Sequence, residues 1–452
     1  MAVLILLLTL ILLWLVYELN WKRRNLPPGP TPFPLIGNLY RMFTCKAPGL
    51  ECYQEWRNQY GDVYTVWMGP EPVVVIAGYQ KLKETFLMDG DSYKDKKIFS
   101  SFNNALRGGD YGVIDTNGEI WREHRRFALH TLRDFGLGKE LMENKILLEV
   151  EQLISEMKNT PNDLDIQNLF DISVGNIINQ FLFGAPDFLE CRDGIFEYIN
   201  KEINAHKMNI DYSLEESKDF TEAYLKEQKR KEANGDLISF SDIQLKNVCF
   251  DMWIAGMHTT MNTLGFLAAY AIQNPQKQKK VHDELDRVIG NRLITMQDRP
   301  SLPYTTAFIN ESQRMANLLP LNLVHATTRD VNIDGYRIPK GTAVVHQISS
   351  VLSDPKIFPN PDEFQPERYL DDLGNLKKIE ELISFSIGKR VCLGEGLART
   401  ELFLFTANML NNFELLPNSD GIPSKHVDFS FIVKQADFKC NARNRFIDDS
   451  NK

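Results

Sequence analysis

The sequence predicts a large, mainly α-helical domain with a small β portion, placed behind a single N-terminal transmembrane anchor. Residues 1–16 are apolar apart from Thr9, as a membrane-spanning helix requires. Long stretches with helical character dominate the rest of the chain, whereas the β-rich runs are short. The expected helices are 120–159, 241–273 and 303–316, and the expected strands are 63–67, 73–77, 326–338 and 342–347.

The composition of the 452-residue chain fits a globular protein in a reducing compartment. Hydrophobic residues make up 43% and charged residues 25%, which is ordinary for a folded domain. The formal net charge of −9 argues against general nucleic-acid binding. The cysteines are scattered without a C-x-x-C pair, so no disulfide framework is expected. They are Cys45, Cys52, Cys191, Cys249, Cys392 and Cys440.

The N-terminal segment 1–19 is predicted to be a membrane signal anchor. A cleaved signal peptide is the alternative, but it would need basic residues before the apolar run and a small-x-small cleavage site after it. Instead, Lys22, Arg23 and Arg24 follow the run, which predicts that the body lies in the cytosol. Residues 20–38 are interpreted as a basic and proline-rich hinge, because prolines exclude a helix and stiffen the chain.

The most informative motif is Phe385-Ser-Ile-Gly388-Lys-Arg390-Val-Cys392-Leu-Gly394. A lone cysteine is usually an inert core residue, but the neighbours of Cys392 favour a metal ligand. Gly388 and Gly394 allow a tight turn or the close approach of a planar group, and backbone amides can then stabilise a thiolate. Arg390 supplies a cation suited to a carboxylate, and Phe385 can cover the sulfur.

This F-x-x-G-x-R-x-C-x-G pattern resembles the heme-binding loop of the cytochrome P-450 family. The resemblance implies a cytochrome P-450-like fold and heme b (iron protoporphyrin IX) as the cofactor, with the Cys392 thiolate as the iron ligand. Residues 39–452 would then form a heme-thiolate catalytic domain. Residues 131–139 and 394–402 look like the microsomal family-2 type, and residues 26–30 (Leu-Pro-Pro-Gly-Pro) resemble the microsomal hinge.

A second motif, Ala255-Gly256-Met257-His258-Thr259-Thr260, stands inside the predicted helix 241–273. A mid-helix glycine costs about 1 kcal/mol relative to alanine, so Gly256 predicts a close approach or a local distortion. Packing alone would explain Thr259, whose hydroxyl can bond back to a carbonyl one turn earlier. The stretch is similar, however, to the family's oxygen-binding motif, which implies that Thr259 supports oxygen activation. His258 replaces the usual Asp or Glu there, and a histidine can shuttle protons near neutral pH.

A third match concerns the stability of the heme loop. Glu311 and Arg314 are three residues apart, which places them on one helix face, and an exposed pair is the ordinary interpretation. Together with Arg368 in the proline-bounded loop 364–369, they resemble the family's Glu–Arg–Arg cluster beneath the heme loop. This resemblance assigns all three a structural role.

Three further residues are expected to contact the heme propionates. The segment Trp121-Arg-Glu-His-Arg125 resembles the family's W-x-x-x-R motif, which would provide an indole N–H and a guanidinium one turn apart. Exposed basic residues on an amphipathic helix are the alternative interpretation. His325 matches a propionate-contacting histidine of many microsomal members, and a histidine without a ligand is its alternative.

The resemblance implies a heme-thiolate monooxygenase of the endoplasmic reticulum membrane, which inserts one oxygen atom of O2 into a xenobiotic, fatty acid or steroid. Electrons would come from an NADPH-dependent flavoprotein reductase, with cytochrome b5 as a further donor, because the chain has no nucleotide-binding fingerprint. Residues 98–115 and 319–323 suggest a mainly apolar substrate pocket. Basic residues suggest a docking patch for the acidic reductase, namely Arg122, Arg126 and Lys389.

Two alternative functions stay open. A heme-thiolate isomerase or dehydratase would need neither a reductase nor the acid–threonine pair, which the substitution at His258 permits. A catalytically degenerate heme-binding protein is suggested by a shortened middle region. Only a few residues separate the segment 183–187 from the segment 194–198. About forty more residues, forming two helices over the pocket, would be expected there. An open pocket, an incorrect splice or an inactive product would each explain this.

Overall fold

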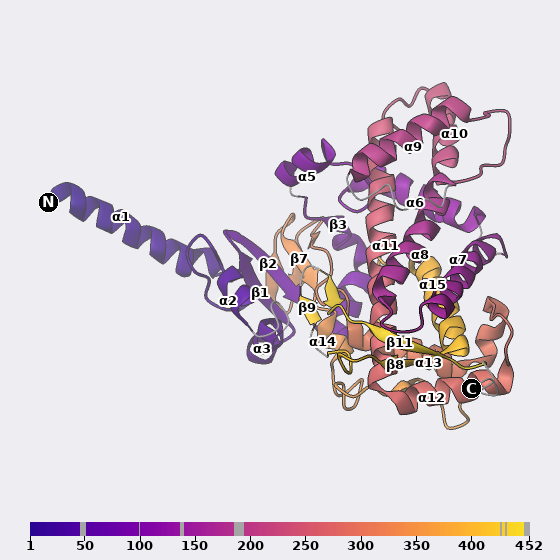
Figure 1. The fold of residues 1–452 in the computed structure, drawn as a ribbon. Coiled ribbons are helices and arrows are strands. Elements are labelled where there is room, and N and C mark those ends of the chain that lie inside the picture. Colours follow the sequence, from indigo (N-terminus) through magenta and orange to yellow (C-terminus); the bar gives the residue numbers. More distant parts are fainter. Residues whose placement is uncertain are drawn as a thin grey trace.

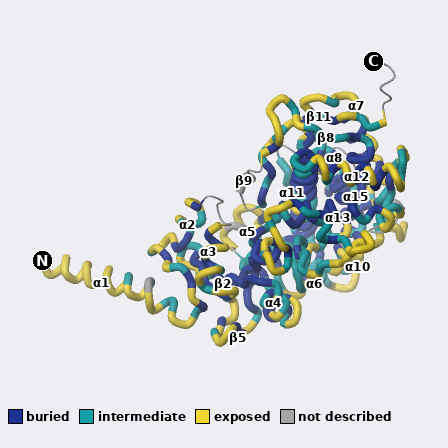
Figure 2. The backbone as a smooth tube through the Cα atoms, turned by 90° about the horizontal axis from the view of Figure 1, so that it is seen from below, coloured by how far each residue is buried: buried dark blue, intermediate teal, exposed yellow. Residues whose placement is uncertain are grey.

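The computed structural model describes residues 1–45, 51–98, 100–135, 140–184, 194–424, 427–429 and 432–446. Helix α1 (Ala2–Leu19) projects away from the body of the molecule, so that its apolar side chains are exposed (Figures 1 and 2). Within the described residues, one helical stretch is long and apolar enough to cross a membrane, Ala2–Arg23 at a mean hydropathy of 2.6. This stretch contains the predicted anchor.

The helical part of the body is built around α11 (Asp242–Gln273), which crosses its centre (Figure 1). Most of α11 is buried (Figure 2), because its residues are apolar on nearly every side and need cover all round. The helices packed against it are α8 (Ile166–Phe183), α9 (Ile195–Asn209), α12 (Pro275–Val288), α13 (Pro303–Ala316) and α15 (Glu395–Asn412).

The other helices cover the ends and edges of this arrangement. They are α2 (Leu39–Thr44), α3 (Glu51–Tyr60), α4 (Tyr79–Leu82), α5 (Ser100–Arg107), α6 (Gly118–Asp134), α7 (Glu140–Asn159), α10 (Phe220–Ala233) and α14 (Ser349–Leu352). Single turns of tighter or wider helix are η1 (Trp21–Arg23), η2 (Lys83–Met88), η3 (Gly90–Ser92), η5 (Met296–Ser301) and η6 (Pro366–Tyr369). The predicted fold class, mainly α with a small β portion, is confirmed.

The largest sheet has the strand order β1-β2-β7-β4-β3 and lies between α1 and the helical body (Figure 1). Its strands are β1 (Val63–Met68), β2 (Glu71–Ile76), β3 (Asp95–Lys96), β4 (His325–Ala326) and β7 (Ala343–His346). The parallel pair β2/β7 aligns Val74 with Val344, and these valines are fully buried. The antiparallel pair β3/β4 places Lys96 opposite His325.

Three two-stranded sheets complete the β portion. They pair β5 (Val331–Ile333) with β6 (Tyr336–Ile338), β8 (Phe413–Pro417) with β11 (Cys440–Asn444), and β9 (Val427–Phe429) with β10 (Val433–Gln435). The expected strand 326–338 is therefore wrong as one element. Asp334 and Gly335 have φ angles of +51° and +85°, so the chain reverses there into a hairpin.

The expected helix 120–159 is also divided. Helix α6 ends at Asp134 and α7 begins at Glu140, and residues 136–139, part of the family-2-like segment 131–139, lie outside the described residues. Helix α13 spans 303–316 as predicted and α11 ends at Gln273, whereas the remaining predicted boundaries differ from the observed ones by one or two residues. Asn274 follows it and Pro275 opens α12, because proline fits the first turn of a helix but not its interior.

Candidate heme-thiolate site

The loop 385–394 leads directly into α15 and holds Cys392 by its backbone. The amide of Cys392 donates to the carbonyl of Phe385 over 3.0 Å. Gly388 has a φ of +84°, and a Cβ built there would lie only 2.1 Å from the carbonyl oxygen of Phe86. Only glycine fits at position 388, because a side chain there would be strained at the positive φ and would clash with the carbonyl oxygen of Phe86. Gly394 has open space where a Cβ would lie, so a flat group can approach this part of the loop.

Cys392 keeps accessible surface although its thiol lies within the protein. The residue is exposed, yet burial raises the pKa of its thiol, while the amide of Gly394 and the charge of Arg125 lower it. The exposed surface therefore belongs to an internal space rather than to the outer surface. Ile254 and Ala255 are likewise exposed in the middle of the otherwise buried α11, as expected if they face free space.

Helix α6 and β4 bring the three expected propionate donors towards this loop. Arg125 donates to the carbonyl of Val391, next to the cysteine, over 2.6 Å. Trp121 is buried and its Nε1 has no hydrogen-bond partner within the described residues. His325 is buried as well: its Nδ1 bonds the carbonyl of Tyr93 over 2.7 Å, and its Nε2 is unpartnered within the same residues.

Arg390 lies between these residues. Its guanidinium stacks on the Trp121 ring at 3.9 Å and donates to the carbonyls of Lys94 at 2.8 Å and Thr116 at 2.6 Å. Burial, followed by the charge of Arg125, lowers the pKa of Arg390 to about 9. A nearby anion would relieve this unfavourable placement of two cations.

Lys96 is a member of this group that the sequence did not reveal. It lies opposite His325 in the β3/β4 pair, only 6% of it is exposed, and its Nζ donates to the carbonyl of Leu323 over 3.1 Å. Burial, and then the charge of Arg390, lower its pKa well below the ordinary value. No motif distinguishes this lysine, because its burial follows from a two-residue strand whose partner is far away in the sequence.

The residues around the loop fit the heme that the resemblance implies. Trp121 Nε1 is a buried donor without a partner within the described residues, which is costly unless a ligand accepts from it. His325 donates through Nδ1 to the carbonyl of Tyr93, so its unpartnered Nε2 would donate as well only in the imidazolium form, which a nearby carboxylate favours. Arg125 and Arg390 add positive charge that suits the two propionate carboxylates of heme, and a nearby carboxylate would favour the charged form of Lys96. The open face of Gly394 suits the flat ring. Cys392 would hold the iron, and the buried donors would hold the propionates.

The oxygen-motif residues lie on α11 with different surroundings. The Thr259 hydroxyl donates to the carbonyl of Ala255 over 2.7 Å, at an exposed position. The ring of His258 is half-buried and lies edge-on to Trp253, with ring centroids 6.4 Å apart, and burial lowers the pKa of its imidazole. Gly256 marks a close approach, as predicted, because a Cβ there would lie 2.5 Å from Cδ1 of Ile178 on α8.

Asp251 is the polar exception in the apolar run of α11, and the structure gives it a partner. Its carboxylate accepts from Arg107 of α5 over 2.5 Å and from the amides of Val113 and Ile114 over 2.7 and 2.9 Å. Burial raises its pKa, and the charge of Arg107 opposes this. This ion pair connects α11, the central helix, with the segment 98–115. That segment is expected to contribute to the substrate pocket.

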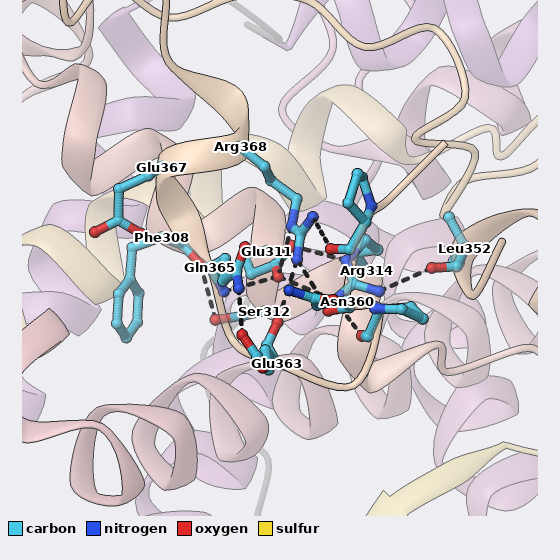
Figure 3. Close-up of polar contacts among 12 residues, drawn as sticks. Phe308, Glu311, Ser312, Arg314, Leu352, Asn360, Glu363, Gln365, Glu367 and Arg368 are labelled. Atoms are coloured by element: carbon cyan, nitrogen blue, oxygen red, sulfur yellow. Dashed lines mark hydrogen bonds and ion pairs between the residues drawn. The ribbon is translucent and has the colours of Figure 1, made fainter. Parts of the chain in front are cut away.

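The predicted structural residues converge at the junction of α13 and η6 (Figure 3). Arg314 binds Glu311 with two parallel hydrogen bonds, Nε to Oε2 at 2.8 Å and Nη2 to Oε1 at 2.9 Å. Arg368 Nε reaches the same carboxylate at 3.0 Å. Glu311 is fully buried, and Arg314 also donates to the carbonyls of Leu352 and Pro361. The cluster therefore joins three chain segments.

The shortened region lies partly outside the described residues, because 185–193 are not described. Where the description resumes, α9 packs against α11, with the rings of Phe196 and Phe250 stacked 4.5 Å apart. Among the described residues, Cys52, Cys249, Cys392 and Cys440 form no disulfide bond.

Comparison with known proteins places the chain in a family. The sequence model of cytochrome P450 matches residues 27–189 and 185–441. Cytochrome P450 2C4 of Oryctolagus cuniculus is 36% identical over 465 residues, covering 94% of each chain. Cytochrome P450 2H2 of Gallus gallus and cytochrome P450 2C8 of Homo sapiens are 34% identical, covering 92% of this chain and 92–93% of the relatives.

The same comparisons locate the shortened region. Each of these alignments is longer than the 452 residues of the chain, so the relatives carry residues without a counterpart here. The two stretches matched by the family model meet at residues 185–189, where the sequence predicts the loss. The family match agrees with the geometry of the Cys392 loop and the residues around it. The chain is a member of the cytochrome P450 family, an oxidoreductase of the monooxygenase type with heme b as its cofactor.

Proposed function

We propose that the protein is a monooxygenase of the endoplasmic reticulum that inserts one oxygen atom of O2 into a lipophilic small molecule, with electrons from an NADPH-dependent flavoprotein reductase. Segment 1–19 acts as the membrane anchor, 20–38 as the hinge and 39–452 as the cytosolic catalytic domain. The observation that carries the proposal is the placement of Cys392, an exposed residue whose thiol lies beside the Gly394 amide and close to the charge of Arg125.

The site residues divide the work among binding, orientation and proton handling. When bound, heme b supplies the iron chemistry that activates O2. Trp121, Arg125 and His325, with Arg390 and Lys96, hold its carboxylates and set its orientation. Phe385 is proposed to cover the sulfur, and the guanidinium of Arg399 lies over its ring at 4.7 Å. Water exclusion around the thiolate supports the electron donation on which oxygen activation depends.

Thr259 and His258 are proposed to handle protons. The Thr259 hydroxyl, at an exposed position on α11, holds its proton on the carbonyl of Ala255 and can redirect it towards the internal space by a rotation about χ1. His258 points towards Trp253, so a proton passing from its ring to Thr259 needs water in between. Because burial lowers its pKa, the imidazole is mainly neutral at pH 7 and can accept a proton.

The test of the proposal is the absorption spectrum of the reduced, carbon-monoxide-bound protein. A strongly red-shifted Soret band is expected, since it reports thiolate ligation. Cys392→Ser should lose this band, whereas Cys440→Ser, the same change at a buried cysteine elsewhere in the chain, should keep it. A normal band in Cys392→Ser would overturn the ligand assignment.

A heme-thiolate isomerase or dehydratase is the second candidate, and His258 is the observation that favours it. Such an enzyme rearranges a peroxide substrate and needs no acid next to Thr259. Turnover of a lipid hydroperoxide without NADPH or reductase would support it. For the monooxygenase, His258→Glu should raise the amount of product formed per NADPH consumed, because a carboxyl restores the usual proton donor. Heme binding without any turnover would mark a degenerate protein.

A further inference from the structure

A polar cluster joins the loop 385–394 to the end of β7. This His346 cluster consists of Asn322, His346 and Ser386. His346 is the last residue of β7, and only 1% of it is exposed. The backbone amide of Asn322 donates to the carbonyl of His346 over 3.0 Å, so backbone pairing fixes these two residues next to each other. Ser386 follows Phe385 in the loop that carries Cys392.

Short hydrogen bonds close the cluster into a triangle. The side-chain amide of Asn322 donates to the hydroxyl of Ser386 over 2.7 Å and reaches Nδ1 of His346 at 2.8 Å. The Ser386 hydroxyl lies 3.2 Å from the same Nδ1. The side-chain oxygen of Asn322 accepts from the amide of Leu323 over 2.8 Å, which fixes the orientation of the Asn322 amide group.

These contacts determine the protonation state of His346. Since the NH₂ group of Asn322 can only donate, Nδ1 of His346 is an acceptor and the ring proton lies on Nε2. Burial, followed by the charge of Lys96, lowers the pKa of His346 well below its ordinary value, so the ring is neutral at pH 7 and keeps this acceptor. The ring is held by packing as well: it lies edge-on to Phe86 and stacks on His325, with centroids 3.4 and 4.8 Å apart.

The backbone of Ser386 needs such an anchor. Its φ is +68°, a conformation that residues other than glycine rarely adopt. The peptide group between Phe385 and Ser386 carries the carbonyl that accepts from the amide of Cys392 over 3.0 Å. A rotation of Ser386 to a negative φ would turn this carbonyl away from the Cys392 amide. The conformation of Ser386 therefore sets the position of the cysteine.

We propose that His346 and Asn322 are positioning residues for the iron ligand. They hold Ser386 in its left-handed conformation, and Ser386 in turn holds the Phe385 carbonyl against the amide of Cys392. Without the cluster, the loop gains conformations in which the sulfur is displaced from the backbone amides that favour a thiolate. The inference rests on the assignment of Cys392 as the iron ligand in the proposed function.

The first test compares the absorption spectra of the reduced, carbon-monoxide-bound full-length variants. His346→Leu removes the acceptor but keeps a buried side chain, whereas His346→Asn offers an oxygen as a substitute acceptor. The ratio of the neutral-thiol band to the thiolate band should rise about five-fold in His346→Leu, as for the loss of one hydrogen bond, and His346→Asn should restore it. The control is His282→Leu, the same change at a buried histidine on α12, which should keep the original ratio.

Two substitutions of Ser386 separate the backbone conformation from the packing. Ser386→Ala loses the hydroxyl but keeps a side chain at the positive φ, so the ratio should rise as in His346→Leu. Ser386→Gly loses the hydroxyl too, but glycine adopts this φ freely, so the ratio should stay close to that of the original protein. Hydrogen–deuterium exchange of the Cys392 amide, which needs no carbon monoxide, should be faster in Ser386→Ala and in His346→Leu only.

Unchanged ratios and exchange rates in His346→Leu and Ser386→Ala would overturn the inference. An equal rise in Ser386→Ala and Ser386→Gly would overturn it as well, because the conformation at position 386 would then be irrelevant. If His346→Leu does not fold, the two Ser386 variants still decide. A missing thiolate band in the original protein would instead contradict the iron-ligand assignment, and amide exchange would then show whether the cluster holds the loop.

Discussion

Glu401 is a buried carboxyl on α15, the helix that begins directly after Cys392, and the proposed mechanism does not use it. It is 1% exposed, and its Oε1 has no partner within the described residues. Burial raises its pKa from the ordinary 4.5 to about 8, and a hydrogen bond from Thr260 acts in the opposite direction. Glu401 is thus neutral at pH 7 and links α15 to the residue beside Thr259.

This pKa makes the stability of the protein depend on pH. The folded state binds the proton of Glu401 more tightly than the unfolded chain, so its contribution is complete below pH 4.5 and is lost as the pH rises through 8. Glutamine cannot ionise. We therefore expect Glu401→Gln to reduce the loss of Tm between pH 5 and pH 8.5, measured by differential scanning fluorimetry.

The matched control is Glu197→Gln, an exposed position on α9, which should leave the pH profile unchanged. If the Tm of Glu401→Gln and of the original protein fall in parallel over this range, Glu401 is not the titrating group.

At the scale of the element, the Glu311 cluster holds α13 and η6 together. Removing one member of a buried ion pair leaves an unpaired charge, at a cost of about 3–5 kcal/mol. Glu311→Ala and Arg314→Ala are therefore expected to abolish heme incorporation, measured by pyridine hemochromogen content. The control is Arg337→Ala, which breaks an exposed pair with Asp330 worth about 1 kcal/mol or less. A holoenzyme spectrum from either cluster variant would contradict the assignment.

The contact of α11 with α8 depends on Gly256. Alanine would gain about 1 kcal/mol of helix propensity but would press its Cβ against Cδ1 of Ile178, and overpacking costs about 1–3 kcal/mol. Gly256→Ala should therefore lower the free energy of unfolding slightly. Ile178→Val removes the contacting methyl group, so the double variant should be more stable than the two single effects predict. Denaturant melts of all four proteins test this coupling, and strict additivity would disprove it.

Glycine at 256 was recognisable from the sequence as a packing residue, but its partner was not. Helical periodicity identifies the buried face of α11, and a mid-helix glycine implies a close neighbour. That the neighbour is Ile178 depends on how α8 crosses α11. The angle and position at which two helices cross depend on the shapes of the side chains along both helices. A local sequence pattern does not contain this information.

At the scale of the whole molecule, Arg122 and Arg126 of α6 and Lys389 of the loop 385–394 are expected to receive the reductase. Arg122 is paired with Glu119 at 2.6 Å and Lys389 lies 3.8 Å from Asp91, so part of their charge is neutralised. Arg126 is exposed and has no ion-pair partner in the described part of the chain. Arg126→Glu should therefore weaken reductase-supported turnover several-fold, with the effect shrinking at high salt.

Peroxide-supported turnover separates docking from damage to the site. It needs no reductase, so Arg126→Glu should leave it unchanged, and Arg287→Glu on α12 should affect neither assay. A parallel loss of both activities in Arg126→Glu would show that the variant harms the heme site rather than the interface.

By itself, the sequence determined the family, the mainly helical fold and the apolar N-terminal helix, and it singled out Cys392 as the proposed iron ligand, because each of these depends on local spacing or composition. It also paired Glu311 with Arg314, which lie one helical turn apart. Only the tertiary structure decided that Lys96 lies beside His325, that Asp251 takes Arg107 as its partner, and that the hinge runs along β1. These groups come from segments far apart in the chain. Their burial, and hence their charge state, exists only once the sheet and the central helix have brought those segments together.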